Sequence, residues 1–131
     1  MNWTKISLVI VGLSIAYLSL KAPSAGVEIH VNDKFGHGLA YFVFTLNLGV
    51  LLQKNNCWWA AIIAFGFSAL LEYLQGFVPG RTVSSLDLLA NASGAVLATL
   101  LLLFFYKSLH QILKKLNLLK KFKKIFNFLL I

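Results

Sequence analysis

The sequence EYLQGFVPGRTVSSLDLLAN, residues 72–91, places charged and amide side chains between two long apolar runs. It contains two of the chain's four acidic residues and its only arginine, Arg81. An ionisable side chain at membrane depth costs free energy unless it is paired or faces a polar cavity, so it indicates a functional site. This stretch therefore predicts two membrane spans joined by a polar turn, with a site beside the turn.

The composition of the 131 residues is that of a membrane protein, because 59% are hydrophobic and only 12% are charged. The single Cys57 excludes an intrachain disulfide, and the three histidines follow no structural zinc spacing, so no metal or other cofactor is expected. The net charge is +8, but seven of the twelve basic residues follow Tyr106 and no acidic residue follows Asp87. This uneven distribution argues against a nucleic-acid partner.

Four apolar runs are long enough to cross a bilayer as helices, and they cover residues 3–20, 36–52, 58–74 and 86–106. Pro79 and Gly80 predict a turn before the last run, with Ser84 or Ser85 as its N-cap. The sequence thus predicts an all-α, integral membrane four-helix bundle over residues 1–106. The first run has an alternative interpretation as a cleaved signal peptide, although Pro23 fits a cleavage site poorly.

Residues 107–131 form a second unit, a basic tail. Apolar residues recur along it at helical spacing, at Leu109, Ile112, Leu113, Leu116 and Leu119. The tail is predicted to be a basic amphipathic helix on the anionic inner leaflet, with binding to a partner helix as the alternative. Since Lys and Arg collect on the cytoplasmic side, both termini are predicted to be cytoplasmic.

This topology brings polar residues from three helices to the outer side of the membrane. Each helix contributes two polar residues three or four positions apart, which therefore share a helix face. Arg81, on the joining loop, can bind a carboxylate or an anion such as phosphate bidentately. The predicted ligand-binding cluster consists of Asp33, His37, Glu72, Gln75, Arg81, Asp87 and Asn91. The alternative is a structural network in which Arg81 clamps Glu72 or Asp87 to hold the loop.

Small residues recur every four positions on the fourth run, at Ala90, Gly94 and Ala98. Such spacing allows close contact between helices, either within the fold or in a homodimer. Packing within the fold is the favoured interpretation.

Together, these residues resemble the VanZ-like family of small bacterial membrane proteins, named for a member associated with teicoplanin resistance. The resemblance covers residues 32–99 and rests on three elements in order, D-K-x-x-H at 33–37, E-x-x-Q at 72–75 and R-x₅-D-x₃-N-x₂-G at 81–94. Ala98 stands where such proteins often repeat a glycine, and the basic tail lies outside the pattern. The resemblance implies a four-helix fold in a bacterial cytoplasmic membrane and a contribution to glycopeptide tolerance, but no settled biochemical activity.

Two functions are compatible with this cluster. The first is binding of a cell-envelope ligand at outer-leaflet depth, whether a lipid headgroup, a cell-wall precursor or a glycopeptide. The alternative is an intramembrane enzyme acting on a lipid-linked phosphate or acyl group, with His37 or Glu72 as acid or base. No nucleophile elbow or metal motif supports catalysis, so the catalytic residues are left open. A proton-linked transporter is disfavoured, because its relay should extend toward the cytoplasm.

Overall fold

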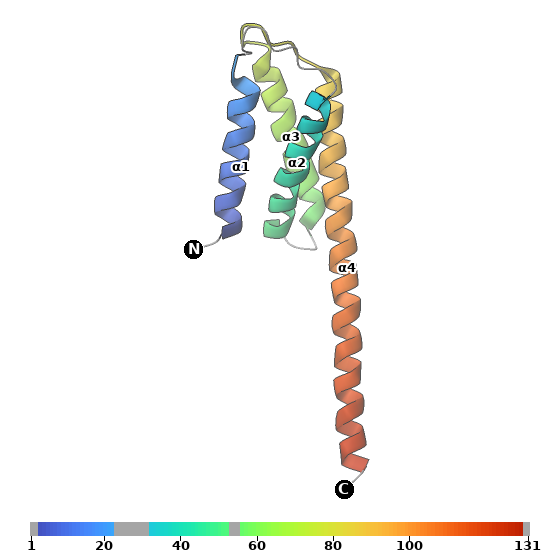
Figure 1. Ribbon diagram of the computed structural model, residues 1–131. Helices are drawn as coiled ribbons and strands as arrows, with labels where there is room; N and C mark the ends of the chain where they lie inside the picture. The colour runs from blue at the N-terminus through green and yellow to red at the C-terminus, as the bar shows by residue number, and fades with distance from the viewer. Residues whose placement is uncertain (1–2, 23–31, 53–55, 130–131) are drawn as a thin grey trace.

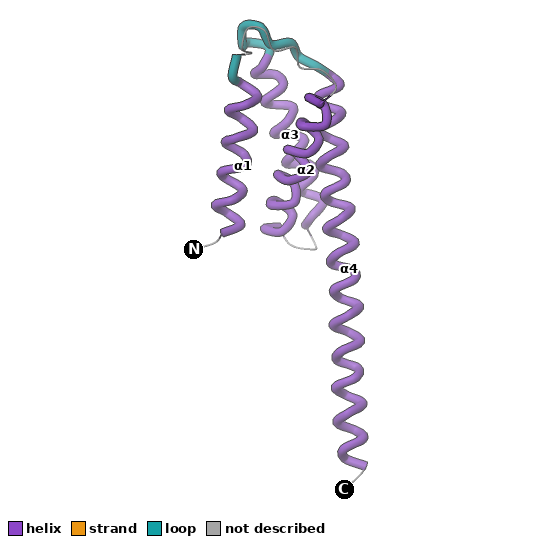
Figure 2. Tube along the Cα trace, viewed as in Figure 1, coloured by secondary structure: helices purple, strands orange, loops and turns teal. Residues whose placement is uncertain are grey.

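The computed structural model describes residues 3–22, 32–52 and 56–129, and these ranges contain four α-helices and no strand. The helices are α1 (Trp3–Leu20), α2 (Asn32–Leu52), α3 (Cys57–Gln75) and α4 (Ser85–Leu129). They stand side by side as an up-and-down bundle, and α4 projects far beyond the other three (Figures 1 and 2). All four are long and apolar enough to cross a membrane. The predicted all-α membrane bundle is therefore confirmed.

The starts of α2 and α4 show how polar residues determine where a helix begins. Helix α2 begins at Asn32, before its apolar run, because Asp33 lies in its first turn, where a negative charge favourably meets the helix dipole. Helix α4 begins at Ser85, since the Ser84 hydroxyl oxygen accepts a hydrogen bond of 3.3 Å from the backbone N–H of Asp87. The prediction of a serine N-cap before the fourth span is therefore confirmed at Ser84.

The basic tail is not a separate helix. Residues 107–129 continue α4 without a break, because no glycine or proline follows Gly94 in the chain. Among the described residues of this projecting part, five large apolar side chains are exposed, those of Leu109, Ile112, Leu113, Leu116 and Leu118. Its position on the inner leaflet stays a prediction.

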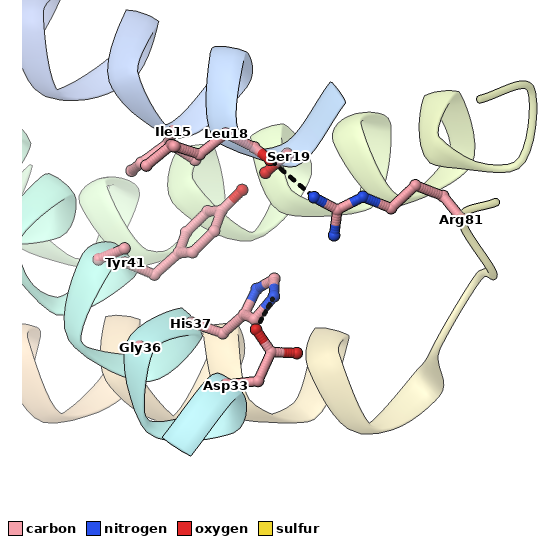
Figure 3. Close-up of a pocket in the computed structure, with 9 residues that line it drawn as sticks. Ile15, Leu18, Ser19, Asp33, Gly36, His37, Tyr41 and Arg81 are labelled. Atoms are coloured by element: carbon pink, nitrogen blue, oxygen red, sulfur yellow. Dashed lines mark hydrogen bonds and ion pairs between the residues drawn. The ribbon is translucent and has the colours of Figure 1, made fainter. Parts of the chain in front are cut away.

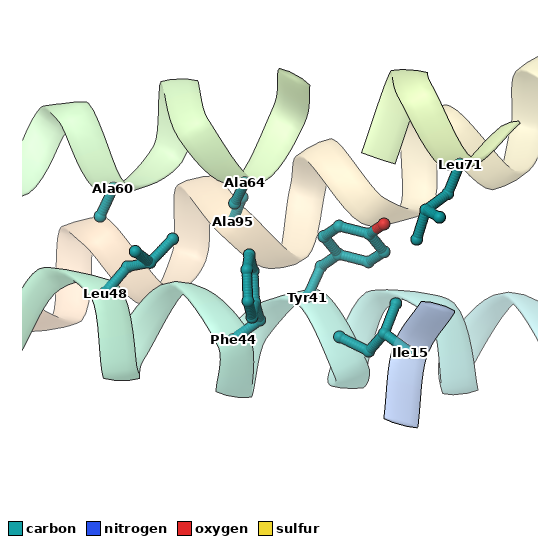
Figure 4. Close-up of a cluster of buried hydrophobic side chains, with 8 residues drawn as sticks. All are labelled: Ile15, Tyr41, Phe44, Leu48, Ala60, Ala64, Leu71 and Ala95. Atoms are coloured by element: carbon teal, nitrogen blue, oxygen red, sulfur yellow. The ribbon is translucent and has the colours of Figure 1, made fainter. Parts of the chain in front are cut away.

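The interior of the bundle is lined mostly by small and aromatic side chains. Its core cluster comprises Ile15, Tyr41, Phe44, Leu48, Ala60, Ala64, Leu71 and Ala95 (Figure 4). Many large apolar side chains face outward instead, among them Val9, Leu13, Ile62, Leu97 and Leu101. This arrangement is typical of a membrane bundle, where the surrounding lipid is as apolar as leucine and close packing holds the helices together.

Helices α4 and α2 approach each other closely at Gly94 and Gly38. A Cβ atom at position 94 would overlap the Gly38 carbonyl oxygen, so only glycine fits there. The helices α2 and α4 also share the most extensive contact in the bundle. The predicted use of Gly94 for packing within the fold is thus confirmed.

At one end of the bundle, the last turns of α1 and α3 meet the first turns of α2 and α4 (Figure 1). We call this region, residues 18–22, 32–41 and 72–91, the polar end. The loop that joins α3 to α4 crosses it and turns at Gly80, whose φ of 77° favours glycine. The polar end therefore collects residues from both halves of the chain.

Candidate functional site

Arg81 reaches from the loop between α3 and α4 to the end of α1. Its Nη2 donates a hydrogen bond of 2.9 Å to the Leu18 carbonyl oxygen, and its Nε donates one of 3.2 Å to that of Lys21. The last carbonyls of a helix have no partner within it, so the guanidinium caps α1. Among the residues that the structure describes, Arg81 has no carboxylate partner. The clamp on Glu72 or Asp87 considered from the sequence is therefore not formed.

Beside Arg81 lies a pocket of about 450 Å³ between α1, α2 and the loop (Figure 3). Asp33, His37 and Arg81 provide its acidic and basic side chains. The rest of the lining is mostly apolar and comprises Ile15, Leu18, Ser19, Gly36, Ala40 and Tyr41. One cavity thus combines the Arg81 cation and the Asp33 carboxylate with hydrophobic walls, and the cation suits an amphiphilic ligand with an anionic group.

Charged side chains from α2 and α4 meet next to the pocket. His37 Nε2 lies 3.7 Å from Asp33 Oδ1. Asp87, near the start of α4, has a carboxylate oxygen within 4.8 Å of ligand atoms on both of these residues. Its Oδ1 forms an ion pair with Lys34, whose ammonium also lies 3.4 Å from the Ser84 hydroxyl oxygen. This cluster ties the start of α2 to the start of α4.

Glu72 is buried and serves the start of α4. Its Oε1 accepts a hydrogen bond from the backbone N–H of Ser84, the N-cap residue. In a capping box this N–H is bound by an acid three residues further along the same helix, whereas here the acid comes from α3. The negative charge also meets the positive end of the α4 dipole. Glu72 therefore has a structural contact and does not line the pocket.

Gln75 and Asn91 make contacts between helices, and each is only 3% exposed. Gln75 Nε2 donates a hydrogen bond of 3.0 Å to the Ser19 carbonyl oxygen of α1. Asn91 Nδ2 donates one of 2.8 Å to the Ser68 hydroxyl oxygen of α3, while its Oδ1 has no hydrogen-bond partner among the described residues. Such bonds join helices where no water competes.

The structure thus divides the seven predicted residues. Asp33, His37 and Arg81 line the pocket, Asp87 lies in the adjoining charged cluster, and the other three lie in helix contacts. Sequence reasoning did not single out Lys34 or Tyr41 as site residues. Tyr41 follows His37 by one helical turn, so the same four-residue spacing could have identified it. Lys34 pairs with a residue 53 positions away, which no local pattern indicates.

Four apolar helices, with a partly polar pocket at one end, define a multi-pass membrane protein with a candidate binding site at the polar end. A model of the VanZ/LLP1 family matches residues 3–106, and the chain belongs to that family. The match includes α1 to α3, the first part of α4 and every residue that lines the pocket. Comparisons with curated proteins and with solved structures find no match.

Proposed function

We propose that this protein binds an anionic, chain-bearing ligand of the cell envelope in the pocket at its polar end. The observation that carries the proposal is the guanidinium of Arg81, which borders the pocket and has no carboxylate partner among the described residues. A lipid headgroup and a lipid-linked cell-wall precursor share the required chemistry, a phosphate joined to an apolar chain. A glycopeptide is the third candidate ligand.

The hydrogen bonds of Arg81 leave capacity for such a ligand. A guanidinium has five N–H donors, and the two bonds described for Arg81 reach neutral carbonyl oxygens. An anion would therefore gain charge-assisted hydrogen bonds without displacing a protein carboxylate. The apolar side chains of Ile15, Leu18 and Ala40 provide a surface for the hydrocarbon part of the ligand.

We place this pocket at the outer leaflet of a bacterial cytoplasmic membrane. The lysine-rich part of α4 extends from the opposite end of the bundle, as Figure 1 shows, and lysine-rich segments favour the cytoplasm. This orientation puts both termini in the cytoplasm and the pocket where envelope precursors and glycopeptides meet the membrane. Binding there supports a contribution to glycopeptide tolerance.

The alternative function, acid–base catalysis on a lipid-linked phosphate or acyl group, has support at one residue. His37 lines the pocket beside Asp33, as a general acid or base would. Glu72, the other candidate, is engaged with the N-cap of α4. Turnover of a lipid-linked substrate that His37→Ala abolishes while ligand binding is retained would favour the enzyme.

The test is a thermal-shift series on the purified protein in detergent. Ligands are an anionic phospholipid, a zwitterionic phospholipid, a lipid-linked wall precursor and teicoplanin. An anionic chain-bearing ligand at 100 times its Kd should stabilise the wild type by about 2.7 kcal/mol, and Arg81→Ala should lose this gain.

A matched control distinguishes loss of the Arg81 charge from loss of a hydrogen bond to α1. Gln75→Leu removes another hydrogen bond to α1, that to the Ser19 carbonyl, and leaves the cation in place. This variant should be less stable but should keep the ligand response. The proposal fails if no ligand stabilises the wild type, or if Gln75→Leu loses the response as completely as Arg81→Ala.

A further inference from the structure

Three metal-ligating side chains converge at the contact between α2 and α4. Asp33 and His37 come from one face of α2, one turn apart, and Asp87 comes from the first turn of α4. Each offers one ligand atom, and the three atoms lie within 4.8 Å of one another. The geometry points to a binding site for a divalent transition-metal ion, such as Zn²⁺ or Mn²⁺, held by these three residues. The sequence did not predict it, because residues 37 and 87 are too far apart for any metal motif.

The separation of the ligand atoms is close to that of a metal site. Zinc lies about 2.0–2.2 Å from nitrogen and oxygen ligands, so neighbouring ligand atoms in a tetrahedral site are about 3.4 Å apart. The three side chains therefore need to close by about an ångström, which rotation of the carboxylates can supply. One imidazole and two carboxylates suit zinc, manganese or iron(II), whereas a thiolate set would favour softer metals.

The charge balance also favours a bound cation. Asp33 and Asp87 together carry two negative charges, and Lys34 is the only cationic lysine or arginine paired with them among the described residues. Its ammonium contacts Asp87 Oδ1 and so provides positive charge at one of the three proposed ligands. The Lys34 side chain is 42% exposed, so it can swing toward water when a metal ion replaces it.

The pocket gives this site access to ligands. Asp33 and His37 line the cavity, so a metal ion bound to them would keep open coordination positions on the pocket side. Three protein ligands with an open position are typical of metal sites that bind or activate a further molecule. The inference goes beyond the proposed function and stands without it, because Arg81 is not a metal ligand and no lipid is required.

The test is metal binding by the full chain in detergent, after removal of metal with a chelator. Co²⁺ serves as the probe, because its visible absorption reports ligand geometry. We expect saturable binding of one Co²⁺ per chain, displaced by Zn²⁺, in the absence of lipid. Substitution of an outer-shell partner already lowers metal affinity roughly 10–100-fold, so loss of a ligand in His37→Ala or Asp87→Asn should lower it by at least about 100-fold.

Two further variants make the result specific. His110→Ala removes an exposed histidine of the projecting part of α4 and should leave Co²⁺ affinity unchanged. Lys34→Met removes the competing ammonium and should raise Co²⁺ affinity by about tenfold, because a unit charge a few ångströms away repels the ion. A gain of affinity at an unchanged stoichiometry of one Co²⁺ per chain, with an unchanged thermal unfolding transition, tests the site even if His37→Ala folds poorly.

Either of two results would overturn the inference. The first is the absence of saturable Co²⁺ binding in both the wild type and Lys34→Met. The second is binding that His110→Ala abolishes and His37→Ala does not, which would mean adventitious binding to a surface histidine. A ligand response that depends on Arg81, together with absent metal binding, would leave the proposed lipid site intact and reject only the metal site.

Discussion

Two sets of polar residues lie at the same end of the bundle but have different partners. The contact set, Glu72, Gln75 and Asn91, is buried, and each member bonds to a neighbouring helix or to the start of one. The pocket set, Asp33, His37 and Arg81, lines a cavity. Both sets contain a charged residue at membrane depth. The polarity of such a residue therefore shows that it has a polar partner, but not which partner. Whether that partner is protein or ligand depends on how each helix is rotated toward its neighbours.

Glu72 and Arg81 illustrate the difference between the two sets. Each lies at a helix end where the helix dipole favours its charge. Glu72 meets the N-terminus of α4 and Arg81 meets the C-terminus of α1. Glu72 is 5% exposed, so its charge acts on the protein alone. Arg81 borders a pocket and makes its described hydrogen bonds with neutral carbonyls, so its charge is available to a ligand.

The largest loss of stability is expected from a substitution that disturbs the contact set and the pocket set together. In Gly94→Ala, the new Cβ overlaps the Gly38 carbonyl oxygen, so α2 and α4 must move apart. Overpacking of this kind lowers the free energy of unfolding by about 3 kcal/mol. The displacement also separates Asp33 and Lys34 from Asp87. Thermal unfolding and chemical denaturation in detergent measure the loss.

A second helical glycine provides the control for this substitution. Gly66, on α3, has no atom within 4 Å of the position that a Cβ would take. Gly66→Ala should therefore change the free energy of unfolding by less than about 1 kcal/mol, in the stabilising direction. If both variants lose stability equally, the close approach of α2 and α4 does not hold the bundle together.

The next largest loss of stability is expected from a substitution within the contact set alone. Glu72→Leu leaves the partly buried N–H of Ser84 without its acceptor, which lowers the free energy of unfolding by about 1–3 kcal/mol. Glu72→Gln keeps an acceptor oxygen and should lose less. The ligand response of the folded protein should survive both changes, as thermal shift would show. A lost response with normal stability would instead move Glu72 into the pocket set and favour the enzyme.

A smaller change in stability is expected at the pocket set. Arg81→Lys keeps the positive charge but cannot reproduce two directed bonds to the Leu18 and Lys21 carbonyls. Two partly exposed hydrogen bonds account for about 1 kcal/mol of stability. The ligand response should be weakened but present, unlike that of Arg81→Ala. A full response in Arg81→Lys would mean that charge alone, without bidentate geometry, binds the ligand.

Much of the fold could be predicted from the sequence, because membrane spans require long apolar runs and each run here is bounded by polar residues. The bounds of α1, Trp3–Leu20, match its run, and α3 extends its run by one residue at each end. The apolar run of α2 starts at residue 36, four residues after the helix itself, since a polar first turn is not distinguishable from a loop by hydropathy; only the spacing of Asp33 and His37 indicated the earlier start. The tail was separated from the fourth span because its charge changes at Lys107, but charge does not end a helix.

The candidate site could be predicted only in part. Spacing identifies which residues share a face of one helix, and it correctly paired Asp33 with His37. It does not fix the rotation of that face relative to other helices. The bonds from Asn91 to Ser68 and from Gln75 to Ser19 join residues 23 and 56 positions apart, so only the packed structure separates the contact set from the pocket set.

The smallest effect on stability is expected from removing the projecting part of α4. A chain that stops after Tyr106 should keep its free energy of unfolding within about 0.5 kcal/mol and retain its ligand response, because the side chains at 109–118 are exposed. Loss of seven lysines should instead weaken the orientation of the bundle in the membrane, which cysteine accessibility from each side would measure. A loss of stability as large as that of Glu72→Leu would show that the tail packs against the bundle or a second copy. The division of the chain at residue 106 would then be wrong, since both sets at the polar end would depend on contacts made at the opposite end.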